Sequence, residues 1–413
     1  MKQVGDWHNA IAHIDADCFY VSCEMTRRPD LRGRPVCVLS NQGAFAIAKS
    51  YDAKAKGVTT GMSVWDAKRL VPDAEFVMPD FRFYGQLSEK MFSVLRRYSP
   101  EMEIYSIDEA FVDMNGIRTL WRKGFRQIGD DIRAAVKREV GITVSVGISN
   151  TRTLAKIASE SNKPDGTSVV PGRRVERFLD DVDVGDIPGI GRNREALLHK
   201  FDIHTAADFI HADESIVHRL LGRHGVVLWQ ELNGRVVQPL QLAPPLPKSV
   251  ARTASMGQVS DDRMLIAAHL SHHTHRLVAD LVARGLMTGR VNVFLTLKSF
   301  ERTGIEMRLE YPCNDLKKIT EAVRRAFELL YRPETLYRGC GIVATHISRV
   351  AVVTHDLFGV MQSDQQQGEL IKTIGRINRR YGNHMVTSAV ALTLGKHESD
   401  LPRFRYPLLT AIA

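Results

Sequence analysis

The chain has 413 residues, of which 44% are apolar and 25% charged, a composition typical of a soluble globular protein and a length that predicts three or four structural units. Its formal net charge is +9, and residues 245–352 hold 16 Lys or Arg against 10 Asp or Glu, which is compatible with a polyanionic partner in that region. No run reaches the ~18 apolar residues of a membrane span, and residues 1–9 lack the apolar stretch of a secretory signal, so we expect a cytoplasmic protein with no membrane partner.

Strands and helices alternate along the first 172 residues. Hydrophobic periodicity predicts, in chain order, a buried strand at 10–15, a strand that becomes a short helix over 44–57, a helix over 84–98, an acidic hairpin, a helix over 117–139, a strand at 142–148 and a helix over 151–161. This order predicts an α+β fold around a small sheet.

Two further units are predicted in the second half. A small helical unit begins near residue 181, and four prolines between 239 and 247 indicate a stiff interdomain linker. The elements expected beyond the linker are strand 249–258, helix 262–284, strands 290–299 and 304–311, helix 314–330, strand 337–351 and a partly helical tail at 366–380. Up to residue 351, this order predicts a compact α/β sandwich with one open sheet face.

Two groups of possible metal ligands have a simpler explanation. The five cysteines include no CxxC pair and are expected to be small buried hydrophobic residues. The four histidines between 269 and 275 are expected to form a polar helix face, because no acid lies among them to support a metal. Neither group indicates a structural metal site.

The acids Asp108 and Glu109 interrupt an apolar, strand-like run over residues 104–112. Two charges there would repel each other at low dielectric unless a cation neutralised them. A second apolar run, 10–14, leads directly into Asp15. Nucleotidyl transfer uses two divalent cations about 3.5–4 Å apart, and carboxylates supply the oxygen ligands that Mg²⁺ prefers. We therefore predict that Asp15, Asp108 and Glu109 bind Mg²⁺; the alternative is that these acids lie in turns and face solvent.

Three sequence blocks, in this order and spacing, resemble the Y-family translesion DNA polymerases, in particular the bacterial branch with UmuC-like and DinB-like enzymes. The blocks are Asp15-Ala16-Asp17-Cys18-Phe19-Tyr20, Ser106-Ile107-Asp108-Glu109-Ala110-Phe111, and Ala155-Lys156-Ile157-Ala158-Ser159 with Lys163-Pro164-Asp165-Gly166. The resemblance covers nearly the whole chain. It implies a multidomain α/β (α+β) right-hand polymerase with palm, fingers, helix-hairpin-helix thumb and a βαββαβ little finger.

The resemblance also implies a division of the chain into domains. The expected regions are the palm at 1–18 and 84–172, the fingers at 19–83, the thumb at 173–238, the linker at 239–248, the little finger at 249–352 and a C-terminal tail at 353–413. In the palm, it implies that Asp15 and Asp108 bind both Mg²⁺ ions and that Glu109 binds the catalytic ion. The backbone carbonyl of Ala16 is expected to complete the coordination of the nucleotide-side Mg²⁺ ion.

Residues that contact the incoming dNTP are also implied. Tyr20 matches the steric gate that would collide with a ribose 2′-OH; the alternative is a buried tyrosine packed against Phe19. Tyr51, Lys54 and Lys156 match positions that hold the triphosphate, where cations and phenol donors offset phosphate charge. Relatives carry Arg in place of Lys54, and an ammonium cannot make the bidentate contact of a guanidinium. The alternative for both lysines is a solvated helix face.

Primer-template DNA is the expected partner of the thumb and little finger. Residues 187–191 resemble a helix-hairpin-helix turn, in which Gly189 and Gly191 let backbone N–H groups approach a phosphate beside Arg192. In the little finger, the candidates that lie on or beside predicted strands are Arg252, Lys298, Arg302 and Arg349. We expect this contact to be salt-sensitive.

The tail has a segment that resembles a degenerate form of the peptide with which relatives bind the sliding clamp. Relatives often carry a Gln-x-x-Leu-Phe-like segment here, and this chain has Asp356, Leu357 and Phe358 as the anchor but Thr354 in place of the glutamine. Accessory subunits, required by some UmuC-like enzymes, are a further possible class of partner.

The predicted function is low-fidelity, template-directed DNA synthesis past damaged bases by two-metal-ion nucleotidyl transfer. One alternative is a catalytically inactive accessory protein that binds damaged DNA and recruits other polymerases, although such proteins tend to lose the acids. A second is a helix-hairpin-helix nuclease, which would not need Tyr20, Tyr51 or Lys156.

Overall fold

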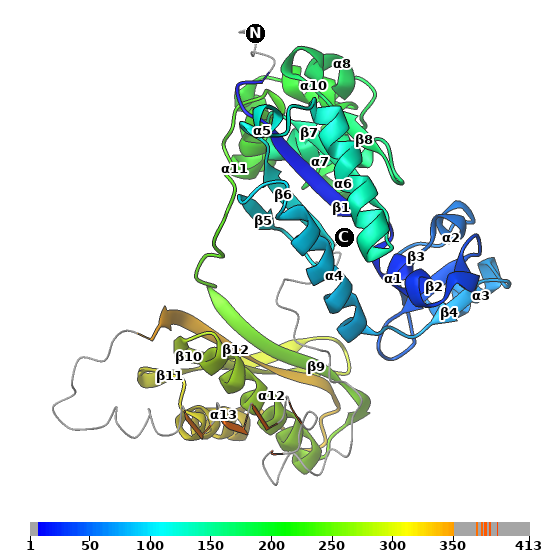
Figure 1. Cartoon of the computed structure of the whole chain (residues 1–413). Coiled ribbons are helices and arrows are strands. Elements are labelled where there is room, and N and C mark those ends of the chain that lie inside the picture. Colours follow the sequence, from blue (N-terminus) through cyan, green and yellow to red (C-terminus); the bar gives the residue numbers. More distant parts are fainter. Residues whose placement is uncertain are drawn as a thin grey trace. The chain divides into compact units, whose positions relative to one another are not determined.

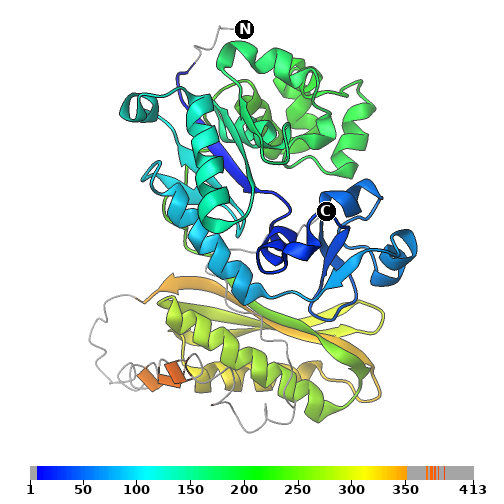
Figure 2. The same ribbon diagram turned by 45° about the vertical axis from the view of Figure 1, so that its right-hand side comes forward.

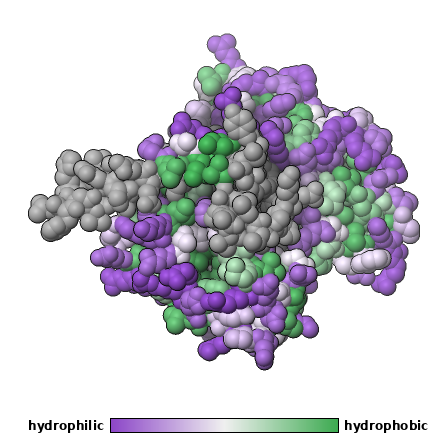
Figure 3. Space-filling view, turned by 90° about the horizontal axis from the view of Figure 1, so that it is seen from below, coloured by the Kyte–Doolittle hydropathy of each residue, from purple (hydrophilic) through white to green (hydrophobic). Residues whose placement is uncertain are grey.

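The computed structural model describes residues 7–350 and scattered positions between 369 and 386. The chain divides into two compact units, and the division falls between Ala243 and Pro244, inside the predicted linker. Figure 1 labels the elements of both units. Within the described ranges, no helix combines the length and apolar character needed to cross a membrane. On the face of the molecule in Figure 3, the described residues are mostly hydrophilic, with smaller hydrophobic patches.

A five-stranded sheet forms the centre of the first unit. Its strand order is β5 (Met102–Ile104), β6 (Glu109–Asp113), β1 (Ile11–Ala16), β7 (Val144–Ser149) and β8 (Thr167–Val169). Helices α4 (Phe81–Leu95) and α6 (Phe125–Val140) pack against one face of this sheet, and α7 (Arg152–Glu160) packs against the other. Because side chains alternate along a strand, His13 and Asp15 face α7 while Ile14 enters the main core.

Close packing of α7 requires small residues on β7. Ser145, Gly147 and Ser149 face the helix, and a Cβ built on Gly147 would lie 2.2 Å from both the carbonyl oxygen of Ala155 and the amide nitrogen of Ser159. The strand and the helix backbone are therefore in direct contact.

A second, smaller sheet lies in the same unit, with strand order β3 (Ala46–Lys49), β2 (Val36–Leu39) and β4 (Glu75–Val77). The helices around it are α1 (Phe19–Arg27), α2 (Tyr51–Ala55) and α3 (Val64–Leu70). The predicted strand and helix over 44–57 are thus confirmed as β3 and α2. The helix ends near Gly57, whose φ of +92° suits glycine.

Four helices, whose apolar core also includes residues of α7, complete the unit. They are α8 (Val175–Leu179), α9 (Arg192–His199), α10 (Ala206–His211) and α11 (Glu214–Leu232). The helical texture predicted from residue 181 is therefore confirmed.

The second unit has the predicted βαββαβ order. Its elements are β9 (Ser249–Ser260), α12 (Arg263–Ala283), β10 (Leu286–Leu297), β11 (Arg302–Cys313), α13 (Leu316–Leu330) and β12 (Tyr337–Arg349). The sheet is antiparallel, in the order β11-β10-β12-β9, and both helices cover the same face (Figure 2). Neither α12 nor α13 covers the other face, which agrees with the sequence prediction.

Two predicted elements differ from the structure. The helix expected over 117–139 is two helices, α5 (Ile117–Trp121) and α6, because Arg122 has a left-handed φ of 51° and Gly124 caps α6. The run at 104–112 is not one strand, since residues 105–108 turn between β5 and β6. In the tail, the described positions between 369 and 380 are helical.

The cysteine and histidine predictions have different outcomes. Cys23, Cys37, Cys313 and Cys340 are buried, as expected, and Cys18 is half-buried. The histidine prediction was partly wrong, because His273 is buried and not on a polar face.

Candidate active site

Strand pairing brings two of the predicted acids side by side. In the antiparallel pair of β1 and β6, Asp15 lies opposite Glu109, so both side chains are on the α7 side of the sheet. One ligand atom from each of Asp15, Glu109 and His13 lies within 4.8 Å of the other two. This separation allows a single cation to contact more than one side chain.

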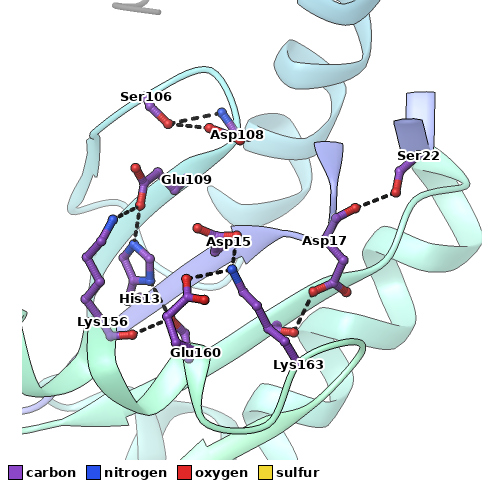
Figure 4. Close-up of polar contacts among 12 residues, drawn as sticks. His13, Asp15, Asp17, Ser22, Ser106, Asp108, Glu109, Lys156, Glu160 and Lys163 are labelled. Atoms are coloured by element: carbon purple, nitrogen blue, oxygen red, sulfur yellow. Dashed lines mark hydrogen bonds and ion pairs between the residues drawn. The ribbon is translucent and has the colours of Figure 1, made fainter. Parts of the chain in front are cut away.

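The third acid, Asp108, lies at the same end of β1, in the turn before β6. Its carbonyl oxygen accepts a hydrogen bond from the Ala16 amide at 2.9 Å, and its Oδ1 accepts one from the Ser106 hydroxyl at 2.5 Å. Figure 4 shows the Asp108 carboxylate held beside Ser106. The turn location matches part of the solvent-facing alternative, but the side chain is not fully exposed.

Lysine side chains neutralise two of the acids. Lys156, on α7, forms an ion pair with Oε2 of Glu109. Lys163, in the loop after α7, donates hydrogen bonds to Asp15 and Glu160, each at 2.6 Å (Figure 4). Both ammonium groups therefore occupy positions where a metal would compete for the same oxygens.

The three acids differ in how easily they ionise. Burial raises the pKa of Asp15 to about 6 and also raises the pKa of Asp108. Burial alone would also raise the pKa of Glu109, but hydrogen bonds and charge from His13 and Lys156 outweigh it and lower that pKa to about 2.

Oxygen donors of this kind fit a divalent cation. Asp15 and Asp108 are half-buried carboxylates whose pKa values are raised, which means that nearby positive charge does not fully offset the loss of solvation. Carboxylate and carbonyl oxygens, including that of Ala16, are the ligands of Mg²⁺. The residues present are therefore compatible with the expected Mg²⁺ site.

Asp17, the second acid of the Asp-Ala-Asp block, has a structural role. It is 2% exposed, its Oδ1 accepts from the Ser145 hydroxyl at 2.7 Å, and its Oδ2 accepts from the Asp165 amide at 2.9 Å. These bonds hold the loop that carries Lys163 against β7 (Figure 4).

Tyr20, the predicted steric gate, lies on α1 in an aromatic cluster. Its ring stacks on Tyr84 with centroids 4.9 Å apart, and Phe81 meets it edge-on at 5.6 Å. Burial first, and then the charge of Asp108, raise the pKa of Tyr20, so the phenol lies near the acidic site. Its ring also tilts against Phe19 at 5.8 Å, so the packing alternative and the gate are compatible.

The predicted triphosphate residues lie on two helices. Tyr51 and Lys54 belong to α2, where Lys54 is exposed and burial raises the pKa of Tyr51. Lys156 contacts Glu109 and lies 5.1 Å from the centre of the Tyr105 ring. The solvated alternative therefore matches Lys54 but does not match Lys156.

The sequence analysis did not assign two residues to the site that the structure places there. His13 is fully buried and contacts Glu109, and Lys163 pairs with Asp15. A histidine inside an apolar strand, and a lysine in a block already tied to the acids, were the signals that could have identified them.

The predicted DNA-binding residues have different environments. Gly189 has a φ of +99°, and Gly191 is the N-cap residue of α9, so no side chain caps the first turn of that helix; Arg192 is exposed. Lys298, Arg302 and Arg349 are also exposed.

Arg252 differs from these candidates. It faces the helices and forms an ion pair with Asp280 of α12, so its assignment as a DNA contact stays a prediction that this pairing does not support. The clamp candidates Asp356, Leu357 and Phe358 lie outside the described residues.

Comparison with known proteins identifies matching families and relatives. Models of the impB/mucB/samB family and of its C-terminal domain match residues 14–160 and 247–357. DNA polymerase IV of Neisseria meningitidis serogroup A is 32% identical over 351 residues, which are 82% of this chain and 96% of the relative. DNA polymerase IV of Bacillus velezensis is 28% identical over 390 residues, 92% of this chain and 93% of the relative.

Solved structures have the same fold. A Y-family DNA polymerase chimera of Dbh and Dpo4 matches with a TM-score of 0.69 and 22% identity, over 82% of this chain and 99% of the other. The insertion ternary complex of Dbh DNA polymerase matches with a TM-score of 0.58 and 20% identity, over 81% of this chain and 98% of the other. Together with the matched relatives, these likenesses show that the chain belongs to the Y-family of DNA polymerases, in its DinB-like branch.

Proposed function

We propose that this chain is a DNA-directed DNA polymerase that performs low-fidelity translesion synthesis on primer-template DNA. The observation that carries the proposal is the pairing of Asp15 with Glu109 on adjacent strands, with Asp108 at the same end of β1. Family membership supports the activity, since the matched relatives are named DNA polymerase IV.

The proposed cofactor is a pair of Mg²⁺ ions. Asp15 and Asp108 would bind both ions, Glu109 the catalytic ion, and the Ala16 carbonyl the nucleotide-side ion. When bound, the ions supply activation of the primer 3′ oxygen and stabilisation of charge on the triphosphate.

Lysines that neutralise the acids before substrate arrives can hold the triphosphate afterwards. Lys156 is within reach of Glu109, and we propose that it transfers its charge-assisted hydrogen bonds to the dNTP, together with Tyr51 and Lys54. Tyr20, fixed by its stack on Tyr84, would exclude a ribose 2′-OH.

DNA would be held without reading its sequence. The uncapped amides at Gly191 are suited to a phosphate, and arginines on the open face of the second unit are suited to the duplex backbone. We also propose that Leu357 and Phe358 dock on a sliding clamp; L357A/F358A should lose clamp-stimulated synthesis while keeping synthesis without clamp.

Primer extension with Mg²⁺ and dNTPs, on undamaged template and past an abasic site, tests the proposal. The wild type should extend both primers. D108N should abolish extension, and E109Q should slow chemistry more than it weakens dNTP binding, since Glu109 is proposed to bind only one ion. D113N, on the same strand as Glu109 but outside the site, is the matched control.

Other outcomes would contradict the proposal. DNA binding without extension would indicate an accessory protein, and shortening of the primer would indicate a nuclease. Extension by E109Q at the wild-type rate would contradict the assignment of this site.

A further inference from the structure

His13 lies in the middle of β1, a position where an apolar strand has no structural need for a histidine. Its side chain is 0% exposed. Nε2 lies 2.8 Å from Oε2 of Glu109, and Nδ1 lies 2.7 Å from the hydroxyl of Ser159 on α7. Figure 4 shows the His13 ring beside Glu109. Both ring nitrogens therefore have a polar partner, and both partner residues are buried.

The hydrogen bonds allow one arrangement of protons on a neutral ring. A proton on Nδ1 would direct the lone pair of Nε2 at the Glu109 carboxylate, a repulsive contact. A proton on Nε2 gives a hydrogen bond to Glu109 and leaves Nδ1 to accept from Ser159. The Ser159 hydroxyl lies 2.7 Å from Nδ1 and also 2.7 Å from the carbonyl oxygen of Lys156, and its single proton can be donated to only one of these two acceptors at a time.

Glu109 has a second partner, and that partner is needed elsewhere. Lys156 also contacts Oε2 of Glu109, and under the proposed function it moves to the triphosphate when dNTP binds. His13 belongs to a central strand and is enclosed by neighbouring side chains, including Phe111 at 4.6 Å between ring centres, so it cannot follow. It is the partner that can hold Glu109 throughout the reaction.

We propose that His13 is a positioning residue, which donates Nε2–H to Oε2 of Glu109 and so keeps Oε1 available for the catalytic metal, while Ser159 fixes the tautomer. This inference rests on the proposed function for its effect on catalysis, but not for its hydrogen bonds. The hydrogen bonds also argue against His13 as a metal ligand, although its ring lies close enough to the acids, because neither nitrogen has a free lone pair.

Two substitutions separate the two ring nitrogens. The amide of Gln reaches the position of Nε2 and can still donate to Glu109, whereas the amide of Asn reaches the position of Nδ1 and contacts only Ser159. H13Q should therefore retain most extension activity. H13N should need about 10- to 100-fold more Mg²⁺ for half-maximal extension, with little change in the KM for DNA. H273N, at another buried histidine, controls for the general cost of the substitution.

A spectroscopic measurement tests the hydrogen bonds without activity. In ¹⁵N-histidine NMR of the metal-free full chain, the signal lost in H13Q belongs to His13 and should show a proton on Nε2 alone; S159A should broaden or shift it. A proton on Nδ1 would overturn the proposal, as would equal Mg²⁺ requirements of H13Q and H13N. If the wild type failed to extend primers, the proposed function would fail, and the NMR result would still decide the hydrogen bonds.

Discussion

Asp15 pairs with Lys163, yet its pKa is about 6 in the folded protein, against 3.8 for an ordinary aspartate. Between pH 3.8 and about 6, Asp15 is therefore mostly protonated in the folded chain and mostly ionised in the unfolded chain. Stability must fall as the pH rises through this window, and the full penalty is present above pH 6. The shift corresponds to about 3 kcal/mol at most. The same burial that raises the pKa of Asp15 therefore destabilises the metal-free protein above pH 6.

D15N should therefore stabilise the metal-free protein. In EDTA, its melting temperature should exceed that of the wild type at pH 7.5 and by a smaller margin at pH 5, because part of the Asp15 penalty is relieved at the lower pH. D113N, on the same sheet, should show the same difference from the wild type at both pH values. A D15N protein that melts below the wild type at pH 7.5 would contradict the assignment.

Tyr20 leads to a second prediction for a single residue. Y20A removes the ring proposed to lie beneath the sugar and should increase incorporation of ribonucleotides relative to deoxyribonucleotides in primer extension. Y20F keeps the stack on Tyr84 and should discriminate like the wild type. Unchanged sugar discrimination in Y20A would refute the assignment.

The sequence was informative about which residues form the site and less informative about their environment. Asp15 and Glu109 could be predicted because charges in apolar strands need compensation. The pairing of Lys163 with Asp15 could not, since it depends on a loop that Asp17 holds in place through two hydrogen bonds. The ion pair of Arg252 with Asp280 also depends on strand register, which the sequence alone does not determine.

Among the elements, the contact between β7 and α7 fixes the position of Lys156 and Ser159. G147A would place a methyl group 2.2 Å from backbone atoms of Ala155 and Ser159, so α7 must move. We expect a loss of more than about 2 kcal/mol of stability, together with weaker primer extension. Thermal melting and extension measure both effects.

A second glycine provides the control for this element. A Cβ added to Gly257 on β9 would have no atom within 4 Å, so G257A should melt like the wild type. If G147A also melted like the wild type, the proposed rigid coupling of strand and helix would be wrong.

Long elements could be predicted from the sequence and short ones could not. The βαββαβ unit follows from period-2 and period-3.6 patterns over 12 or more residues in each element. The three-residue strands β5 and β8 have too few residues to show any period. The helix predicted at 117–139 breaks where Arg122 adopts a positive φ. Hydrophobic periodicity does not indicate this backbone conformation.

At the scale of the whole molecule, the arginines on the face of the second unit's sheet that α12 and α13 do not cover are the proposed contact with DNA. Arg302 lies over the Phe294 ring at 5.0 Å, and strand register sets Arg308 directly opposite Arg290. Like charges opposite each other are unfavourable unless an anion lies between them. Glu306 pairs with Arg290 and relieves part of this repulsion. A duplex backbone on this face would relieve the rest.

The double variant R302A/R308A should therefore bind primer-template more weakly, with a salt dependence that is less steep by about 0.9 in log–log slope for each lost phosphate contact. Fluorescence anisotropy across a salt series measures this slope. R324A removes an exposed charge from α13, on the covered side of the sheet, and should leave the slope unchanged. Equal slopes for both variants would mean that net charge, and not the open face, determines DNA binding, because only a localised contact distinguishes arginines on the open face from an arginine on the covered side.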